Sequence, residues 1–142
     1  MKYLKIHSLE KGWRDRDSIM LHAAFQILVD FVNLEKPGKI IDWNSDDAHK
    51  KAWKEICDLY KWWTKKRPNR KYPIENKRLK TPPFEFEDIP GSECKRRKEP
   101  DRKKYAACYR AMEKQIKLDK EYHEEDQKNL HRLIEIRPFL WT

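Results

Sequence analysis

Glycine and cysteine are scarce in this sequence, and their scarcity argues against several kinds of protein. The 142 residues include three Gly and three Cys. Cys57, Cys94 and Cys108 are odd in number and form no C-x-x-C pair, which argues against a disulfide framework and against a zinc site. We therefore expect a protein of a reducing cytosol.

Targeting and catalytic motifs are missing as well. The sequence has no apolar signal-peptide core near its first residues and no long apolar run, so we expect neither secretion nor a membrane span. It also lacks a Gly-rich phosphate loop and a nucleophile–base pair with an orienting partner. No catalytic residue, metal ligand or cofactor is therefore predicted, and binding functions are favoured over an enzyme.

Basic residues, by contrast, are abundant and unevenly distributed. Lys and Arg number 33 against 24 Asp and Glu, a net charge of +9, and the mean hydropathy is -1.10. Residues 65–104 alone hold 15 basic and seven acidic side chains, so nearly all of the excess lies in this segment. A local basic segment predicts an anionic partner, such as nucleic acid, a nucleotide or an acidic protein. The alternative is a solvated loop that only aids solubility.

The high content of charged residues is typical of disordered chains, but the content of aromatic residues indicates a folded one. The chain has six Trp, six Tyr and five Phe, whereas disordered chains are poor in aromatic residues. Its length suits one domain with a modest core. We expect a single helical domain over residues 1–142, with residues 67–100 as a proline-rich basic loop.

Apolar spacing and helix-end signals predict an all-α fold, a bundle of three long helices. The first helix is predicted over residues 18–34, with Asp17 or Ser18 as its cap, and "EKPGK" ends it. The second follows a cap at Asn44 or Ser45 and ends before a proline. Its inward stripe is predicted to hold Ala52, Ile56, Leu59 or Tyr60, and Trp63.

The third helix is predicted over residues 101–137. Its stripe has near-heptad spacing and comprises Tyr105, Cys108, Met112, Ile116, Asp119, His123, Asp126, Leu130, Leu133 and Arg137. Because the middle of this stripe is polar, we expect the helix to kink or split there. The long connection between the second and third helices, residues 67–100, holds six of the eight prolines and is predicted to lack regular structure.

One polar line runs along the otherwise apolar first helix. His22, Gln26 and Asp30 are spaced by four, so they share one side of an α-helix. Buried polar groups need partners, and two interpretations meet that need. In one, the line belongs to a structural polar layer completed by three residues of the third helix, Asp119, His123 and Asp126. In the other, it lines a ligand cavity between the helices.

Acidic residues offer two weaker alternatives. Asp119 and His123 have metal-ligand spacing, but the Glu-x-x-His pairs of di-iron bundles are absent, so no metal site is predicted. E-x-x-D at residues 55–58 and E-x-x-E at residues 121–124 match motifs of helical nucleotide pyrophosphatases. The motifs occur in the reverse order, and such matches are expected by chance among 24 acidic residues.

Trp62 is predicted to lie outside the inward stripe of the second helix, on a polar face. An exposed indole there is either an anchor for a partner or a platform that stacks on a nucleotide base. Lys65, Lys66 and Arg67 follow within a turn or two and are predicted to bind phosphate. The alternative is that the proline-rich loop covers Trp62.

Arginines also lie near the ends of two helices. Arg14 and Arg16 precede the first helix, where backbone amides attract anions, and Arg132 and Arg137 flank the end of the third. If these helices are antiparallel, the two pairs approach one another. The candidate ligand-binding residues are Arg14, Arg16, His22, Gln26, Asp30, Trp62, Lys66, Arg67, His123, Arg132 and Arg137.

Three stretches resemble a widespread group of small tailed-phage proteins, most of them without a known role: "MLHAAFQILVDFV", "IDWNSDDAHKKAWKEICDLYKWW" and the C-terminal "HRLIEIRPFLWT". The resemblance covers parts of all three helices, does not cover the basic segment, and supplies no catalytic motif. It implies a phage protein that acts in the host cytoplasm. Small phage proteins of this kind often disable host machinery or sequester the nucleotide signals of host immunity.

Three functions follow from these patterns. The first is a phage-encoded protein that sequesters a small phosphate-bearing ligand, such as a nucleotide immune signal of the host. The second is nucleic-acid binding by residues 65–104, where Tyr72, Phe84 and Phe86 lie among the cations. The third is an inhibitor that docks on a host protein. Because the first helix is apolar on every side except its polar line, we also expect a homo-oligomer.

Overall fold

The computed structural model describes residues 3–141, which fall into two compact units. The helical unit comprises Met1–Arg70 and His123–Thr142, and the basic unit comprises Lys71–Tyr122. Helix α4 (Ala106–Glu135) contributes its first part to the basic unit and its last part to the helical unit. The prediction of one domain over the whole chain stays a prediction.

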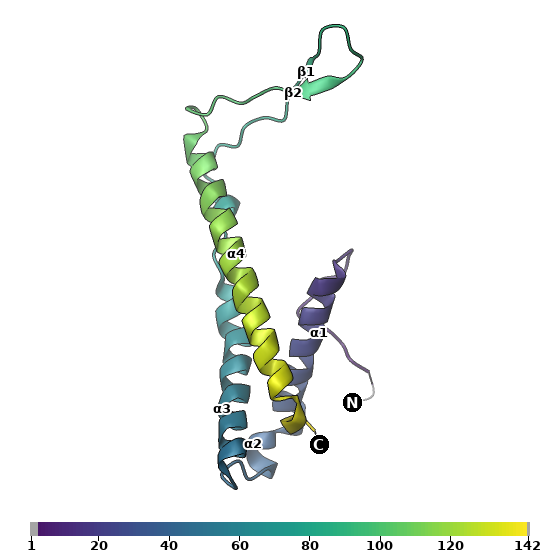
Figure 1. Cartoon of the computed structure of the whole chain (residues 1–142), viewed down its shortest axis with the longest axis vertical. Coiled ribbons are helices and arrows are strands. Elements are labelled where there is room, and N and C mark those ends of the chain that lie inside the picture. The colour runs from purple at the N-terminus through teal and green to yellow at the C-terminus, as the bar shows by residue number, and fades with distance from the viewer. Residues whose placement is uncertain (1–2, 142) are drawn as a thin grey trace. The chain divides into compact units, whose positions relative to one another are not determined.

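Three long helices make the chain mostly helical, as the sequence predicted. Within the helical unit, α3 (Asp47–Lys61) runs opposite to α1 (Arg16–Asp30), and the last part of α4 again runs in the direction of α1 (Figure 1). The short helix α2 (Pro37–Ile40) lies in the connection between α1 and α3.

Other helical turns extend these helices. The π-helical segments η1 (Phe31–Glu35) and η2 (Trp62–Lys66) continue α1 and α3. The 3-10 turns η3 (Arg67–Asn69) and η5 (Arg137–Phe139) follow η2 and α4. The second predicted helix therefore does not stop before its proline, because a 3-10 turn accommodates proline in its first positions.

Both predicted helix caps are wrong. Asp46 caps α3, where its Oδ1 accepts a hydrogen bond from the backbone N–H of His49 at 2.8 Å. The extended backbone of Asp46 turns the carboxylate back over the first turn. Asn44 lies in a preceding turn, in which its own N–H donates to Oδ1 of Asp42 at 3.0 Å. Asp15 precedes α1 and makes no side-chain cap bond.

The core of the helical unit is apolar and rich in aromatic rings. Phe25 and Leu28 of α1 and Ile56 and Leu59 of α3 are 0% exposed. Leu133 of α4 completes the same cluster. These contacts confirm the inward stripe predicted for α3.

Trp62 is buried in this core, so the prediction of an exposed indole is wrong. Trp62 and Trp63 are each 6% exposed, and their ring centroids lie 5.2 and 4.5 Å from that of Phe25. Both side chains reach the core because they follow the buried Leu59 by three and four residues, which places both on its side of the helix. The polar face was predicted from the charged residues at positions 51, 55 and 58, without the spacing of Trp62 from Leu59.

Helix α4 is one uninterrupted helix, so it does not split at the polar middle of the predicted stripe. Its buried positions are Cys108, Gln115, Asn129 and Leu133, of which Cys108 and Leu133 belong to the predicted stripe. Met112, Ile116, Asp119 and His123 are exposed. The prediction followed apolar residues, whereas the buried face of α4 includes the two amides Gln115 and Asn129.

The basic unit contains a short antiparallel sheet, which corrects the prediction of a connection without regular structure. Strand β1 (Phe86–Asp88) pairs with β2 (Lys95–Arg97), so that Phe86 lies opposite Arg97 and Asp88 opposite Lys95. The turn between them includes Gly91 at a positive φ of 74°, a conformation that glycine adopts without strain. The 3-10 turn η4 (Pro73–Glu75) precedes the sheet.

One stretch of the helical unit, Arg16–Glu35, is long and apolar enough to cross a membrane by length and composition. The sequence analysis did not anticipate such a stretch. It is weak evidence for a membrane span, because the core helix of a soluble protein passes the same test. Phe25 and Leu28 in this stretch lie wholly inside the protein core.

Candidate functional site

The polar line of α1 binds the segment that precedes the helix. The ring Nδ1 of His22 lies 2.7 Å from Oγ of Ser8. Oε1 of Gln26 accepts a hydrogen bond from the backbone N–H of His7 at 3.0 Å, and Nε2 of Gln26 donates to Oδ1 of Asp30 at 2.8 Å. The line is thus a polar layer, but residues 7 and 8 supply its partners and the predicted residues of the third helix do not.

His22 is held in its neutral form. Burial, followed by the positive charge of Arg67, lowers its pKa from 6.5 to about 4. Its ring also contacts Trp63 edge-on, with the centroids 4.9 Å apart. A neutral imidazole with these contacts locks the preceding segment onto α1.

We expect this histidine to make the folded state sensitive to mild acid. The folded pKa of about 4 lies below the unfolded value of 6.5, so the contribution of His22 is complete above the unfolded pKa and decreases as the pH falls through this interval. Between about pH 7 and pH 5 the free energy of unfolding should fall by roughly 2 kcal/mol. His22→Asn should flatten this dependence in urea titrations, whereas the same change at exposed His131 should not. Equal pH profiles for the His22→Asn variant and the unaltered protein would contradict the assignment.

Three cations of η2 and η3 form ion pairs with two carboxylates of α4. Arg67 binds Asp126 in a bidentate manner, with both N···O distances at 3.0 Å. Nη2 of Arg70 lies 2.8 Å from Oε2 of Glu125 and 2.7 Å from Oδ1 of Asp126. Lys66 donates to Glu125 at 3.0 Å. We call these five residues the ion-pair cluster.

The buried tryptophans lie under this cluster. The guanidinium carbon of Arg67 is 4.7 Å from the ring centroid of Trp63, and that of Arg70 is 5.7 Å from that of Trp62. The predicted combination of an indole and phosphate-binding cations therefore exists, but the indole is covered and the cations already bind carboxylates. The ion-pair cluster and these tryptophans together form a tertiary contact between the end of α3 and α4.

Electrostatics favour the charged forms of both carboxylates. Burial alone would raise the pKa of Asp126, but hydrogen bonds from Arg67 and Arg70 outweigh it and hold that pKa below its usual range. The pKa of Glu125 is lowered in the same way, against the effect of burial, by Arg70 and Lys66. Removal of Asp126 therefore leaves Arg67 without its counter-charge, whereas Arg70 keeps its ion pair with Glu125.

Asp126→Asn should destabilise the helical unit. It leaves the partly buried guanidinium of Arg67 without a counter-charge and removes one of the two carboxylates that bind Arg70. Breaking a buried pair costs about 3–5 kcal/mol, and a partly exposed pair costs less. Thermal unfolding followed by circular dichroism should show a lower Tm for this variant. The matched control is Glu121→Gln, an exposed position on the same helix. An unchanged Tm for Asp126→Asn would mean that the cluster does not hold α3 and α4 together.

The remaining predicted arginines do not converge on one site. Nε of Arg132 donates to Oε2 of Glu55 at 2.7 Å, and this hydrogen bond lowers the pKa of Glu55. Arg14 lies 3.9 Å from Glu10. The antiparallel arrangement on which their approach depended is wrong, because α1 and the last part of α4 run in the same direction (Figure 1). Arg14 and Arg16 therefore lie at the opposite end of the helical unit from Arg137.

The acidic motifs of α3 and α4 show no metal-binding arrangement. Among residues 3–141, no group of three or more His, Cys, Asp and Glu side chains is placed to hold a metal ion. His123 is exposed on α4 and is not part of the polar layer. Glu55, the first residue of the E-x-x-D motif, binds Arg132.

The sheet of the basic unit has one face on which charges are paired. Residues opposite one another in an antiparallel sheet point to the same side, and alternate residues along a strand share that side. Arg96 binds Glu87, its partner across the sheet. Lys98 lies 3.7 Å from Glu85 on the same side. These ion pairs leave this face electrically balanced.

The opposite face of the sheet exposes aromatic rings beside an arginine. Phe84 and Phe86 are 69% and 56% exposed, and their rings meet edge-to-face with centroids 5.3 Å apart. The guanidinium carbon of Arg97 lies 4.3 Å from the ring centroid of Phe84. Within residues 3–141, Arg97 has no ion pair. We call Phe84, Phe86 and Arg97 the aromatic face.

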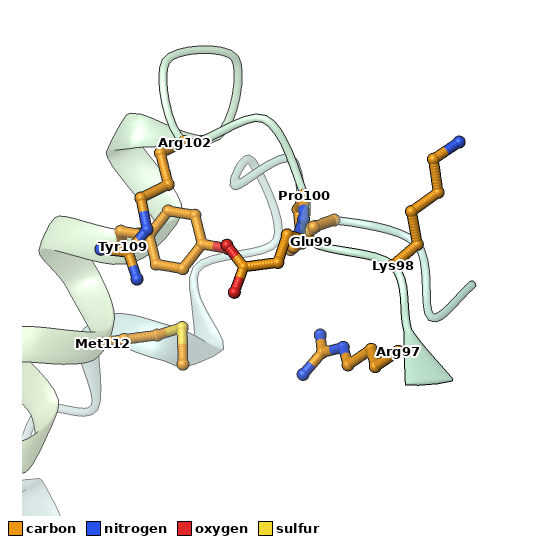
Figure 2. A pocket seen from close by; sticks show the side chains of 8 residues that line it. Arg97, Lys98, Glu99, Pro100, Arg102, Tyr109 and Met112 are labelled. Carbon is orange, nitrogen blue, oxygen red and sulfur yellow. The ribbon is translucent and has the colours of Figure 1, made fainter. Parts of the chain in front are cut away.

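A pocket of about 290 Å³ adjoins the aromatic face and shares Arg97 with it. Figure 2 shows the guanidinium of Arg97 extending into the space before α4, and the guanidinium of Arg102 against the ring of Tyr109, 5.3 Å from the ring centroid. Glu99 also lines the pocket, whereas the side chain of Lys98 points away in this view. With more cations than carboxylates in its lining, the pocket suits an anion such as a phosphate group.

Sequence reasoning named two members of this site, Phe84 and Phe86, and missed Arg97, Arg102 and Tyr109. The sequence did contain a signal for the sheet. In "FEFED" and "KRRK", alternate side chains would point to opposite faces of two paired strands. Tyr72, the third aromatic residue named, instead packs edge-to-face on Tyr122 with the centroids 5.8 Å apart.

Comparison of the chain with models of protein families, with curated proteins and with solved structures finds no match. The resemblance to small tailed-phage proteins therefore stays a prediction, as does a location in the host cytoplasm.

Proposed function

We propose that this protein binds single-stranded nucleic acid through the basic unit. The observation that carries the proposal is the position of Arg97. Its guanidinium lies over Phe84, at 4.3 Å from the ring centroid, and also lines the anion-binding pocket. A base stacked on the exposed rings and the adjoining phosphate would thus meet the same side chain.

The physical basis is the combination of stacking with charge. Each base that stacks on an aromatic side chain contributes about 1–3 kcal/mol, with little dependence on sequence. The cations attract the phosphate backbone and release its counterions, so affinity should fall steeply as salt rises. Phe84, Phe86 and Arg97 supply both contributions on one surface.

Charge pairing favours the basic unit over the helical unit as the site. Lys66 and Arg67 are the cations that the sequence offered for phosphate binding, and both bind carboxylates of α4. A phosphate there would have to displace Glu125 or Asp126. On the aromatic face, Arg97 forms no ion pair among residues 3–141, although Glu99 lines the same pocket and Asp88, which pairs with Lys95, lies on the same face.

A second candidate function is sequestration of a small phosphate-bearing ligand, such as a nucleotide immune signal, by a phage protein. The pocket itself favours it, because about 290 Å³ between Arg97, Arg102 and Tyr109 can hold a phosphate with part of a nucleoside. No described contact favours the third function, an inhibitor that docks on a host protein.

Single substitutions on the two faces of the sheet test the first proposal. Phe84→Ala should weaken binding of a single-stranded oligonucleotide roughly 5- to 100-fold, the range expected for one lost stacking contact. Arg97→Gln should also weaken it several-fold. Arg96→Gln is the matched control, because it removes the same charge from the opposite, balanced face and should change affinity by less than about twofold. Fluorescence anisotropy at two salt concentrations gives each affinity, with circular dichroism as the check on folding.

Two outcomes would overturn the first proposal. Equal losses from Arg97→Gln and Arg96→Gln would indicate attraction by overall charge and not by the aromatic face. Binding of mononucleotides or cyclic nucleotides that Arg97→Gln abolishes, without binding of the oligonucleotide, would replace it with sequestration.

A further inference from the structure

Helix α1 has an apolar stripe that points away from the core. Met20, Ile27 and Leu34, which continues the stripe into η1, are spaced by seven and are 61%, 40% and 72% exposed. Met20 and Ile27 lie along one side of α1, and Leu34 extends the exposed apolar surface into the π-helical turn η1. Phe25 and Leu28, which face the core, are 0% exposed. The helix is thus apolar on its covered side and on this open side.

A hollow lies beside the far end of this stripe. Its volume is about 370 Å³, and it is lined by Ile27, Phe31, Leu34, Leu140 and Trp141 together with the acidic residues Asp30 and Glu35. Trp141 is 76% exposed. This surface can pack against a second copy of itself, because the protruding apolar side chains at one end can contact the apolar part of the hollow at the other end.

We infer that this stripe is the interface of a symmetric dimer in which two copies of α1 cross in antiparallel orientation at Ile27. A twofold axis there places Met20 of each copy opposite Leu34 of the other, beside the hollow. An isologous interface of this type uses the same patch on both copies. The inference is independent of the proposed nucleic-acid binding.

Charges at the ends of the stripe favour a second copy in antiparallel orientation. Arg16 and Asp17 begin α1, whereas Glu35 and Lys36 end the helical stretch. An antiparallel pair brings each end against the other, so that both basic residues meet an acidic one. A parallel pair would place Asp17 against Asp17 and Asp30 against Asp30, and such like-charge contacts disfavour association.

A lipid bilayer is a poorer occupant of the same stripe. Asp30 lies between Ile27 and Leu34, and a carboxylate in hydrocarbon is costly. To span a bilayer, α1 would also have to withdraw Phe25 and Leu28 from the core. Against a second copy, Asp30 keeps its hydrogen bond from Gln26 at 2.8 Å and meets the small residues Ala23 and Ala24.

Sedimentation velocity of the full chain tests the interface. The unaltered protein should sediment as a dimer, and Ile27→Glu should raise the dissociation constant at least roughly tenfold while the circular dichroism spectrum is kept. Ile134→Glu is the matched control, because Ile134 is also an exposed isoleucine, on α4, and its change should leave the dimer intact. A monomeric unaltered protein would overturn the inference.

Cysteine cross-linking tests the orientation, in a Cys94→Ser background that removes the exposed native thiol. Ile27→Cys should cross-link to itself. Met20→Cys and Leu34→Cys should cross-link when the two variants are mixed, and neither should do so alone. Self-cross-linking of Met20→Cys would indicate a parallel pair and overturn the inference. So would flotation of a monomeric protein with vesicles of phosphatidylcholine and phosphatidylglycerol that Ile27→Glu abolishes.

Discussion

The ion pairs of Arg67 and Arg70 with Asp126 are the contacts on which the rest of the arrangement depends. They join the helical turns after α3 to α4 across nearly sixty residues of sequence. Directly beyond them, the backbone of Lys71 exchanges hydrogen bonds with the hydroxyl of Tyr122, both at 3.1 Å. The first and last residues of the basic unit are therefore held together. The charged, partly buried ion pairs offset the entropy cost of closing this long loop.

The two units use the same chemical groups in opposite ways. In the helical unit, Arg67 lies over Trp63, but the ring is buried and the guanidinium binds a carboxylate. In the basic unit, Arg97 lies over Phe84, but the ring is exposed and the guanidinium has no ion pair among residues 3–141. A guanidinium that binds a carboxylate of the protein stabilises the fold, whereas one without an ion pair is available to bind a ligand. The contrast is our reason for placing the proposed function on the sheet.

The features that could be predicted were those set by the spacing of apolar residues along the sequence. The α3 stripe was predictable because Ala52, Ile56 and Leu59 repeat with helical spacing, and they are buried. Trp62 was misplaced because its charged neighbours four and seven residues earlier were considered and the buried Leu59, three residues earlier, was not. The buried face of α4 was missed because Gln115 and Asn129 are polar.

The sequence also did not reveal which distant segments of the chain contact one another. The polar line of α1 was correctly read as needing partners, but no spacing rule identifies residues 7 and 8 as the segment that supplies them. The same holds for the carboxylates that neutralise Lys66 and Arg67. On the sheet, Phe84 and Phe86 were identified from composition, whereas Arg97 became apparent only once the register placed it opposite Phe86.

The most direct test of the proposed function is the position of a photochemical cross-link. Single-stranded DNA that contains 5-bromouracil would be irradiated in complex with the protein, and the modified peptides would be identified by mass spectrometry. Our account predicts adducts on Phe84 or Phe86, the exposed rings beside Arg97. Adducts confined to Trp13 or Trp141, the exposed tryptophans of the helical unit, would contradict it.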